Sequence, residues 1–129
     1  MKRKTLFFLF SCSTVFAFAA NTFVTTHGDD AQDGTSWESS MSSIQAAIDA
    51  SSSGDTVFIA EGTYNQSVKL KDGVHLLGGY DPSTGKRDYE TYPTVLDGTN
   101  LGKALISQGS AFKVPTYFDG LILQNAHHS

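Results

Sequence analysis

Cysteine, basic residues and long apolar runs are scarce in this sequence, and each scarcity excludes a class of protein. Cys12 is the only cysteine among 129 residues, and it lies in an apolar N-terminal segment, so the rest of the chain offers no disulfide. No apolar run after that segment approaches the roughly 20 residues that a membrane-spanning helix needs. We therefore expect a small domain that is stabilised by its core alone and has no transmembrane span.

The shortage of basic residues gives the chain an acidic balance. Nine Lys and Arg residues face thirteen Asp and Glu residues. Three of the basic residues, Lys2, Arg3 and Lys4, precede the apolar segment; without them six basic residues face thirteen acidic ones, a net charge of −7. An acidic surface argues against nucleic acid and anionic membrane surfaces as partners.

The first 19 residues have the pattern of a secretory signal peptide. A basic start is followed by an apolar run over residues 6–20 and by the small-residue cleavage signal Ala17-Phe18-Ala19. The run of about 15 residues is short for a membrane anchor. We therefore divide the chain into a signal peptide (1–19) and an exported domain (20–129), whose new N-terminus would be Ala20.

Lipidation of Cys12 is the alternative to this cleavage. Residues 9–12 loosely resemble a lipobox, in which the cysteine is lipidated and becomes the N-terminus. Phe10 fits that motif poorly, and the apolar run continues past Cys12. Cleavage after Ala19 is the better interpretation.

Short apolar segments separated by Gly, Asp and polar corners follow Gly54. Strands of this length cannot bury their side chains alone, which favours stacking on similar strands, as in a solenoid. The predicted strands are residues 57–60, 68–70, 74–77, 95–96, 104–106 and 121–123, preceded by an opening strand at 22–25.

One amphipathic helix is predicted before these strands, over residues 42–50. Its apolar residues recur at helical spacings of three and four: Trp37, Met41, Ile44 and Ile48. Ser42 and Gln45 have the spacing of an N-terminal capping box, and Gly54 suits the left-handed position after a helix.

Three tyrosines mark a turn-rich excursion over residues 80–93, which we expect to protrude as a loop. Tyr80, Tyr89 and Tyr92 could present a stacking platform for sugar rings, together with Tyr64 and Trp37. Anchoring of the loop and the core is the competing interpretation of these side chains.

Two groups of aspartates are candidate sites. Asp29, Asp30 and Asp33 lie close together between glycines; they are weak candidates for Ca²⁺ and fit turn formation better. The second group, Asp72, Asp97 and Asp119, each precedes a glycine and could align as a ladder of carboxylates, but Asp-Gly is also a common corner dipeptide. We assign no catalytic residue, metal or cofactor.

Histidine offers little more. His75 lies in an apolar strand, where a packed or edge side chain is expected. His127 and His128 have the chemistry to bind a transition metal weakly, but they stand at the end of the sequence.

The order of the motifs resembles the N-terminal part of exported right-handed parallel β-helix proteins. The motifs are Gly34-Thr35-Ser36-Trp37, Ile44-Gln45-Ala46-Ala47-Ile48, Gly54-Asp55-Thr56-Val57, Glu61-Gly62-Thr63-Tyr64, Lys71-Asp72-Gly73-Val74, Gly78-Gly79-Tyr80, Val95-Leu96-Asp97-Gly98 and the segment 118–126. These motifs are similar to those of the pectin-lyase-like superfamily. Within that superfamily, the sequence resembles large bacterial surface proteins of the polymorphic outer-membrane-protein type. The resemblance implies an all-β solenoid: the N-terminal coils of a right-handed parallel β-helix, with one short capping α-helix.

The same resemblance implies a function. We expect a non-catalytic capping segment of an adhesin-like surface protein, secreted or held in the envelope or on the outer surface of a bacterium. Proteins of this kind carry more coils, so the domain is expected to be incomplete and to self-associate through a C-terminal coil that exposes residues 121–123. A polysaccharide-active lyase or hydrolase that has its catalytic coils elsewhere, and a small carbohydrate-binding module, remain alternatives; the expected partner is a polysaccharide or an envelope component.

Overall fold

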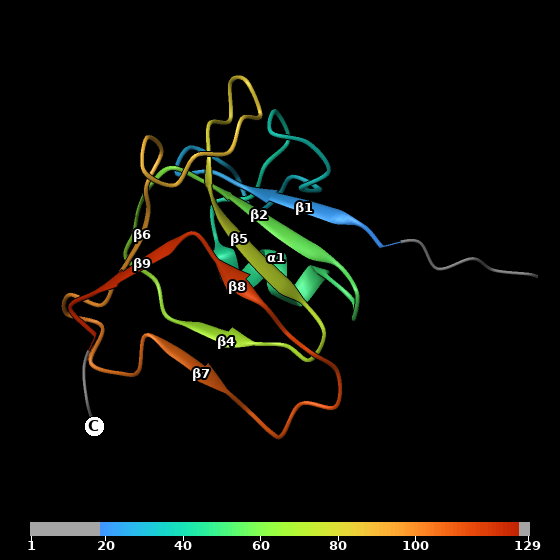
Figure 1. The fold of residues 1–129 in the computed structure, drawn as a ribbon, viewed down its shortest axis with the longest axis vertical. Coiled ribbons are helices and arrows are strands. Elements are labelled where there is room, and N and C mark those ends of the chain that lie inside the picture. Colours follow the sequence, from blue (N-terminus) through green and yellow to red (C-terminus); the bar gives the residue numbers. More distant parts are fainter. Residues whose placement is uncertain (1–18, 127–129) are drawn as a thin grey trace, which may run out of the picture.

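The computed structural model describes residues 19–126, which are mostly β-strand with one short helix (Figure 1). Cys12, His127, His128 and residues 1–18 of the expected leader lie outside the described residues. No helix in the described part is long and apolar enough to cross a membrane. The elements are β1 (Asn21–Val24), α1 (Ile44–Ala50), β2 (Thr56–Ala60), β3 (Gly62–Tyr64), β4 (Val68–Leu70), β5 (His75–Tyr80), β6 (Thr94–Asp97), β7 (Ile106–Gln108), β8 (Phe118–Asp119) and β9 (Leu121–Gln124).

The strands form three sheets that the chain visits in a fixed rotation. Their orders are β1-β2-β5-β8, β3-β6-β9 and β4-β7. We call one passage through the three sheets a circuit: β2, β3 and β4 form the first, β5, β6 and β7 the second, and β8 and β9 the third. Each circuit pairs in parallel with the one before it, so the circuits stack in chain order (Figure 1).

Residues in register form columns that run through the stacked circuits and make the core. Val57 pairs with Leu76 in the first sheet, and Tyr64 pairs with Leu96 in the second. All four side chains are at most 2% exposed. Because side chains alternate between the two faces of a strand, these columns point to one shared interior. Ile44 of α1 packs into the same cluster.

The stack is closed at the end where β1 and α1 lie. Met41 pairs with the outer edge of β1: its N–H donates to the Phe23 carbonyl at 2.9 Å, and its carbonyl accepts from Thr25 N–H at 2.9 Å. The outer edge of β4 is closed by a side chain. Lys69 N–H donates to Gln45 Oε1 at 2.7 Å, and Gln45 Nε2 donates to the Lys69 carbonyl at 3.4 Å. These contacts give the outer edges of β1 and β4 hydrogen-bonding partners, where another strand could otherwise pair.

The helix begins later than predicted. Ser43, not Ser42, is the N-cap, since its Oγ accepts from Ala46 N–H at 3.1 Å. The predicted capping box is therefore wrong, and the Gln45 side chain serves β4 instead. Gln66 joins the start of the helix to the corner before β4: its Oε1 accepts from Ile44 N–H at 2.8 Å.

The helical spacing of Trp37 and Met41 with Ile44 and Ile48 wrongly groups these first two residues with the helix. Both residues precede α1, and Met41 is held instead by a bridge to Val24 of β1. The helix ends at Ala50, so Gly54 is not its C′ residue; it lies in the following turn with a φ of 99°. A local period predicts a helix only where tertiary pairing does not capture the same residues.

The predicted strands are confirmed to within one or two residues at β1, β2, β4, β6, β7 and β9, whereas β5 extends three residues past the predicted end at residue 77. At β7 the whole strand is displaced by two residues: residues 104–106 are predicted and Ile106–Gln108 are observed. β3 and β8 are not predicted, because three or two residues carry no alternating pattern. They are strands because a neighbouring circuit pairs with them.

Candidate functional site

The end of the stack formed by β8 and β9, called here the open end, leaves core positions uncovered. Phe118 pairs with the buried Leu76, and Leu123 pairs with the buried Leu96, so both continue inward columns. Phe118 is nevertheless 48% exposed and Leu123 is 45% exposed. Side chains that register assigns to the interior thus lie in solvent, because no described circuit covers them.

The outer edge of β9 also has backbone groups without a strand partner among the described residues. Gly98 N–H donates to the Gln124 carbonyl at 2.9 Å, so Gln124 faces β6. In a parallel strand adjacent residues direct their N–H and C=O groups to opposite neighbours. Leu123 therefore directs its N–H and C=O away from β6, to the side where no described strand lies.

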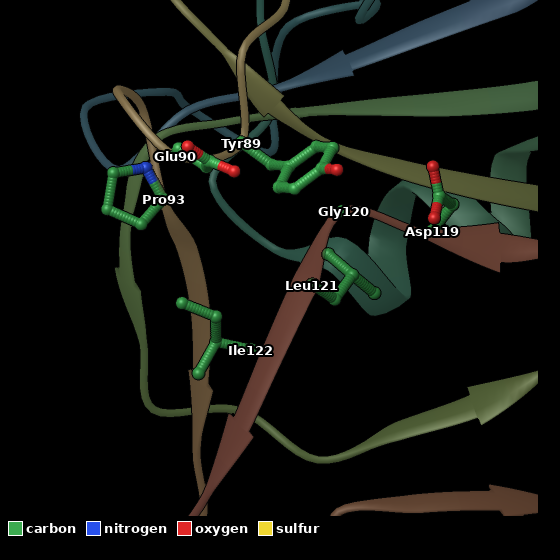
Figure 2. Close-up of a pocket in the computed structure, with 7 residues that line it drawn as sticks. All are labelled: Tyr89, Glu90, Pro93, Asp119, Gly120, Leu121 and Ile122. Atoms are coloured by element: carbon green, nitrogen blue, oxygen red, sulfur yellow. The ribbon is translucent and has the colours of Figure 1, made fainter.

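A cleft of about 700 Å³ borders the open end (Figure 2). Figure 2 shows the Tyr89 ring projecting toward the corner at Gly120, with Leu121 and Ile122 on the adjoining strand. The lining residues are Tyr89, Glu90, Pro93, Asp119, Gly120, Leu121 and Ile122. The cleft thus combines one exposed aromatic ring and two carboxylates with apolar side chains of β9.

Arg87 holds the corner of this cleft. Its Nη2 lies 2.7 Å from Asp119 Oδ2, and its Nε donates to the Gly78 carbonyl at 2.9 Å. The hydrogen bond from Arg87 holds the pKa of Asp119 below its ordinary value. Gly120 turns this corner with a φ of 71°, and a Cβ there would lie 2.6 Å from the Gly78 carbonyl oxygen. Only glycine fits this close approach of the two circuits.

The three tyrosines of the expected sugar platform occupy different positions. Tyr80 packs outside the first sheet, with ring centroids 5.0 Å from Phe58 and 5.7 Å from Trp37. Tyr89 is 55% exposed in the cleft, while Tyr92 is half-buried. Among the described residues no aromatic contact joins two of the three tyrosines. Of the three tyrosines, Tyr89 is therefore the one whose ring is accessible to a ligand in the cleft.

The aspartates of the first loop, Asp29, Asp30 and Asp33, hold local structure. Asp29 and Asp33 each accept the N–H two residues further along the chain. Asp30 accepts from the N–H groups of Ser42 and Ser43, which fixes the loop to the start of α1. Within residues 19–126 no three His, Cys, Asp or Glu side chains converge as a metal site would require.

The three Asp-Gly aspartates do not form a ladder. Asp97 ends β6 and pairs with Gln124, whereas Asp119 pairs with Leu77 in a different sheet. Asp72 lies in the turn before β5, where it accepts two backbone N–H groups of the segment before β8 at 3.0 Å each. The alignment considered from the sequence is therefore wrong, and each carboxylate has its own separate hydrogen-bonding partners.

His75 connects the second circuit to the third. Its Nδ1 accepts from Tyr117 N–H at 3.1 Å, and the two rings stack at 5.2 Å. The side chain is half-buried, which agrees with a packed or edge position. This contact guides the chain into β8 at the open end.

Comparisons with protein-family models, with curated proteins and with solved structures found no match. Function is therefore inferred from the residues and geometry of the chain itself.

Three polar residues have roles that the sequence does not predict. Gln45 and Gln66 close the capped end, and Asp55 accepts N–H groups from two segments before β2. A glutamine side chain that replaces a strand partner leaves no local pattern. Asp55 alone had a signal, since it directly precedes an apolar strand.

Proposed function

We propose that this chain is the N-terminal capping segment of an exported, adhesin-like bacterial surface protein whose fold is a right-handed parallel β-helix. The rotation of the chain through three parallel sheets supports this fold, since each circuit then corresponds to one coil. The motif resemblance and the signal-peptide pattern support the surface location. The role is architectural and non-catalytic.

The difference between the two ends of the stack carries the proposal. At the β1 end, Met41 and Gln45 satisfy the strand edges. At the open end, Phe118 and Leu123 occupy core columns but lie in solvent. A segment whose strand edges are paired at one end and unpaired at the other can begin a stack. Its unpaired strands then set the strand register of the next coil.

The occupant of the open end is a further β-strand layer. In the complete surface protein this layer is the following coil. In the isolated domain a second copy supplies it, because two open ends can pair with one another through a two-fold axis. Self-association through β8 and β9 is therefore part of the proposal.

Serine variants at the open end and inside the stack test the proposal. Phe118→Ser and Leu123→Ser remove apolar surface from the open end, whereas the control Leu76→Ser acts one circuit further inside. We expect the wild-type domain to associate in sedimentation velocity experiments and to bind a hydrophobic fluorescent dye. The two open-end variants should stay folded, sediment as monomers and bind less dye, while Leu76→Ser should unfold. A wild-type domain that is monomeric and binds no dye would refute an open end.

One observation favours a second candidate function, carbohydrate binding. Tyr89 is exposed in the cleft beside Glu90 and Asp119, and aromatic faces with nearby carboxylates suit sugar rings. Tyr89→Ala should abolish binding to an envelope polysaccharide, while Tyr92→Ala, from the same loop, should retain it. Equal binding by wild type and Tyr89→Ala would exclude this cleft as the sugar site.

A further inference from the structure

The residue that would become the N-terminus after cleavage contacts a buried carboxylate. Ala20 N–H donates to Asp55 Oδ1 at 2.9 Å, and Ser52 N–H donates to Asp55 Oδ2 at 2.8 Å. Asp55 is only 9% exposed. Ala20 as a residue is exposed, and its contact with Asp55 is partly buried.

Asp55 has no cationic partner among the described residues. Its hydrogen-bond donors are neutral backbone N–H groups, and the ion pair within the described part of the chain joins Arg87 to Asp119 instead. The nearby Lys71 donates to the Ser51 carbonyl and not to Asp55. A carboxylate this buried is costly unless a cation balances it.

The strand register places Ala20 beside Asp55. Asn21 pairs with Thr56 at the start of the β1–β2 ladder, and Ala20 and Asp55 are the residues directly before them. Thr56 N–H also donates to the Ala20 carbonyl at 3.1 Å. The Ala20 nitrogen is therefore held in place by the ladder and does not depend on a flexible side chain.

We propose that cleavage between Ala19 and Ala20 creates an α-ammonium group that forms an ion pair with Asp55 and stabilises the first circuit. Water hydrolyses the Ala19–Ala20 peptide bond: Ala19 gains a carboxylic acid and the Ala20 nitrogen leaves as an amine. Transfer of one proton from the acid to the amine then gives a carboxylate and an ammonium. The neutral N–H···O contact then becomes a charge-assisted one at the same position. Removal of the leader thus couples export to folding stability.

This inference rests on the export part of the proposed function and not on the open end. The first experiment expresses residues 1–129 with the native leader in a bacterium and determines the N-terminus of the exported product by mass spectrometry. We expect the product to begin at Ala20. A product that begins at another residue would overturn the inference, and a chain that is not exported would overturn the export proposal as well.

The second experiment measures the ion pair in that product. The α-amine is acetylated selectively in urea near pH 6.5, where it is more reactive than lysine, and the chain is refolded beside a mock-treated sample. The acetylated Ala20 keeps its N–H but loses its charge. We expect the equilibrium constant for unfolding of the acetylated domain to be about tenfold higher than that of the mock-treated domain, because charge-assisted hydrogen bonds are stronger than neutral ones.

Asp55→Asn supplies the matched control, since it keeps an acceptor at the same place without the charge. In this variant acetylation should change the unfolding equilibrium by less than about twofold. If the variant does not fold, the acylation rate of the Ala20 amine serves in its place: the rate should be at least about tenfold slower in the folded wild type than in urea. Equal rates, or acetylation without effect on wild-type stability, would overturn the ion pair while leaving the open-end proposal intact.

Discussion

The carboxamide of Gln45 occupies the place of a strand beside Lys69. It accepts the Lys69 N–H at 2.7 Å and donates toward the Lys69 carbonyl at 3.4 Å, so the outer edge of β4 has a hydrogen-bonding partner. Gln45 also donates to Asp49 within α1 at 3.0 Å, which holds the side chain in this position. The helix therefore closes the stack through a specific polar contact as well as through its apolar face.

Gln45→Ala should destabilise the domain by about 1 kcal/mol, because the Lys69 N–H loses its partner. The free energy of unfolding, measured by urea titration, checks this value. Gln32→Ala, in an exposed loop, is the control and should change stability by less than about 0.5 kcal/mol. Equal effects of the two substitutions would show that the carboxamide does not close the strand edge.

Leucines of the same column should differ in their contribution to stability. Leu96 is fully buried and Leu123 is 45% exposed, although the two residues pair. We expect Leu96→Ala to cost about 2–5 kcal/mol and Leu123→Ala less than about 1 kcal/mol in a monomer. Urea unfolding at low protein concentration measures both. Similar losses would mean that another part of the protein covers β9.

Asp97 should make the domain sensitive to acid. Hydrogen bonds from Thr99, first of all from its hydroxyl, and from Asn125 and Gln124 hold the pKa of Asp97 far below its ordinary value of 3.8. Because the folded pKa is lower than the unfolded one, this stabilisation is complete above the unfolded pKa and is lost as the pH falls toward the folded value. Asp97→Asn should therefore show a flatter dependence of the urea midpoint on pH between about 2 and 5.

Other aspartates leave part of this dependence in place. Local hydrogen bonds also lower the pKa values of Asp33, Asp81 and Asp88. If the urea midpoint of Asp97→Asn depends on pH in the same way as that of the wild type, Asp97 does not contribute to the acid sensitivity.

Tyr64 should make the domain sensitive to alkali. Burial, followed by the charge of Glu61, raises the pKa of Tyr64 well above its ordinary value of 10.0. The neutral phenol stabilises the fold below the unfolded pKa, and that contribution is lost as the pH rises above it. The ultraviolet titration of tyrosinate should show Tyr64 ionising only with unfolding.

Tyr64→Phe separates the phenol from the ring. The hydroxyl donates to the Ala60 carbonyl at 3.0 Å, and Thr94 also donates to that carbonyl at 3.0 Å, so the acceptor keeps one partner. We expect a loss of about 1 kcal/mol at neutral pH and a weaker dependence of stability on pH above 10. An unchanged alkaline transition would assign that transition to another group.

The sequence predicts the core columns better than the side-chain contacts. Val57, Leu76 and Leu96 stand out because each lies in an apolar segment between polar or glycine-containing corners, and burial depends directly on that pattern. Phe118 belongs to a column as well, but its two-residue strand exists only through pairing with β5. Such short strands form only because distant segments pair, and a local sequence pattern does not predict that pairing.

The positions of the tyrosines and aspartates could not be predicted for a related reason. Tyr80 and Tyr89 belong to the same predicted loop, but Tyr80 ends β5 and packs on Phe58 while Tyr89 enters the cleft. Asp97 and Asp119 share the Asp-Gly motif, but they belong to different sheets. The direction of a side chain depends on register, which the length of each corner sets.

The exchange rates of two backbone amides in the processed domain test the central claim of one closed end and one open end. Hydrogen exchange followed by NMR, at a concentration where the domain is monomeric, compares Lys69 N–H at the closed end with Leu123 N–H at the open end. We predict that Lys69 exchanges at least about a hundredfold more slowly than an unstructured peptide and that Leu123 exchanges within about tenfold of it. Protection of Leu123 equal to that of Lys69 in the monomer, or an unprotected Lys69, would contradict the account.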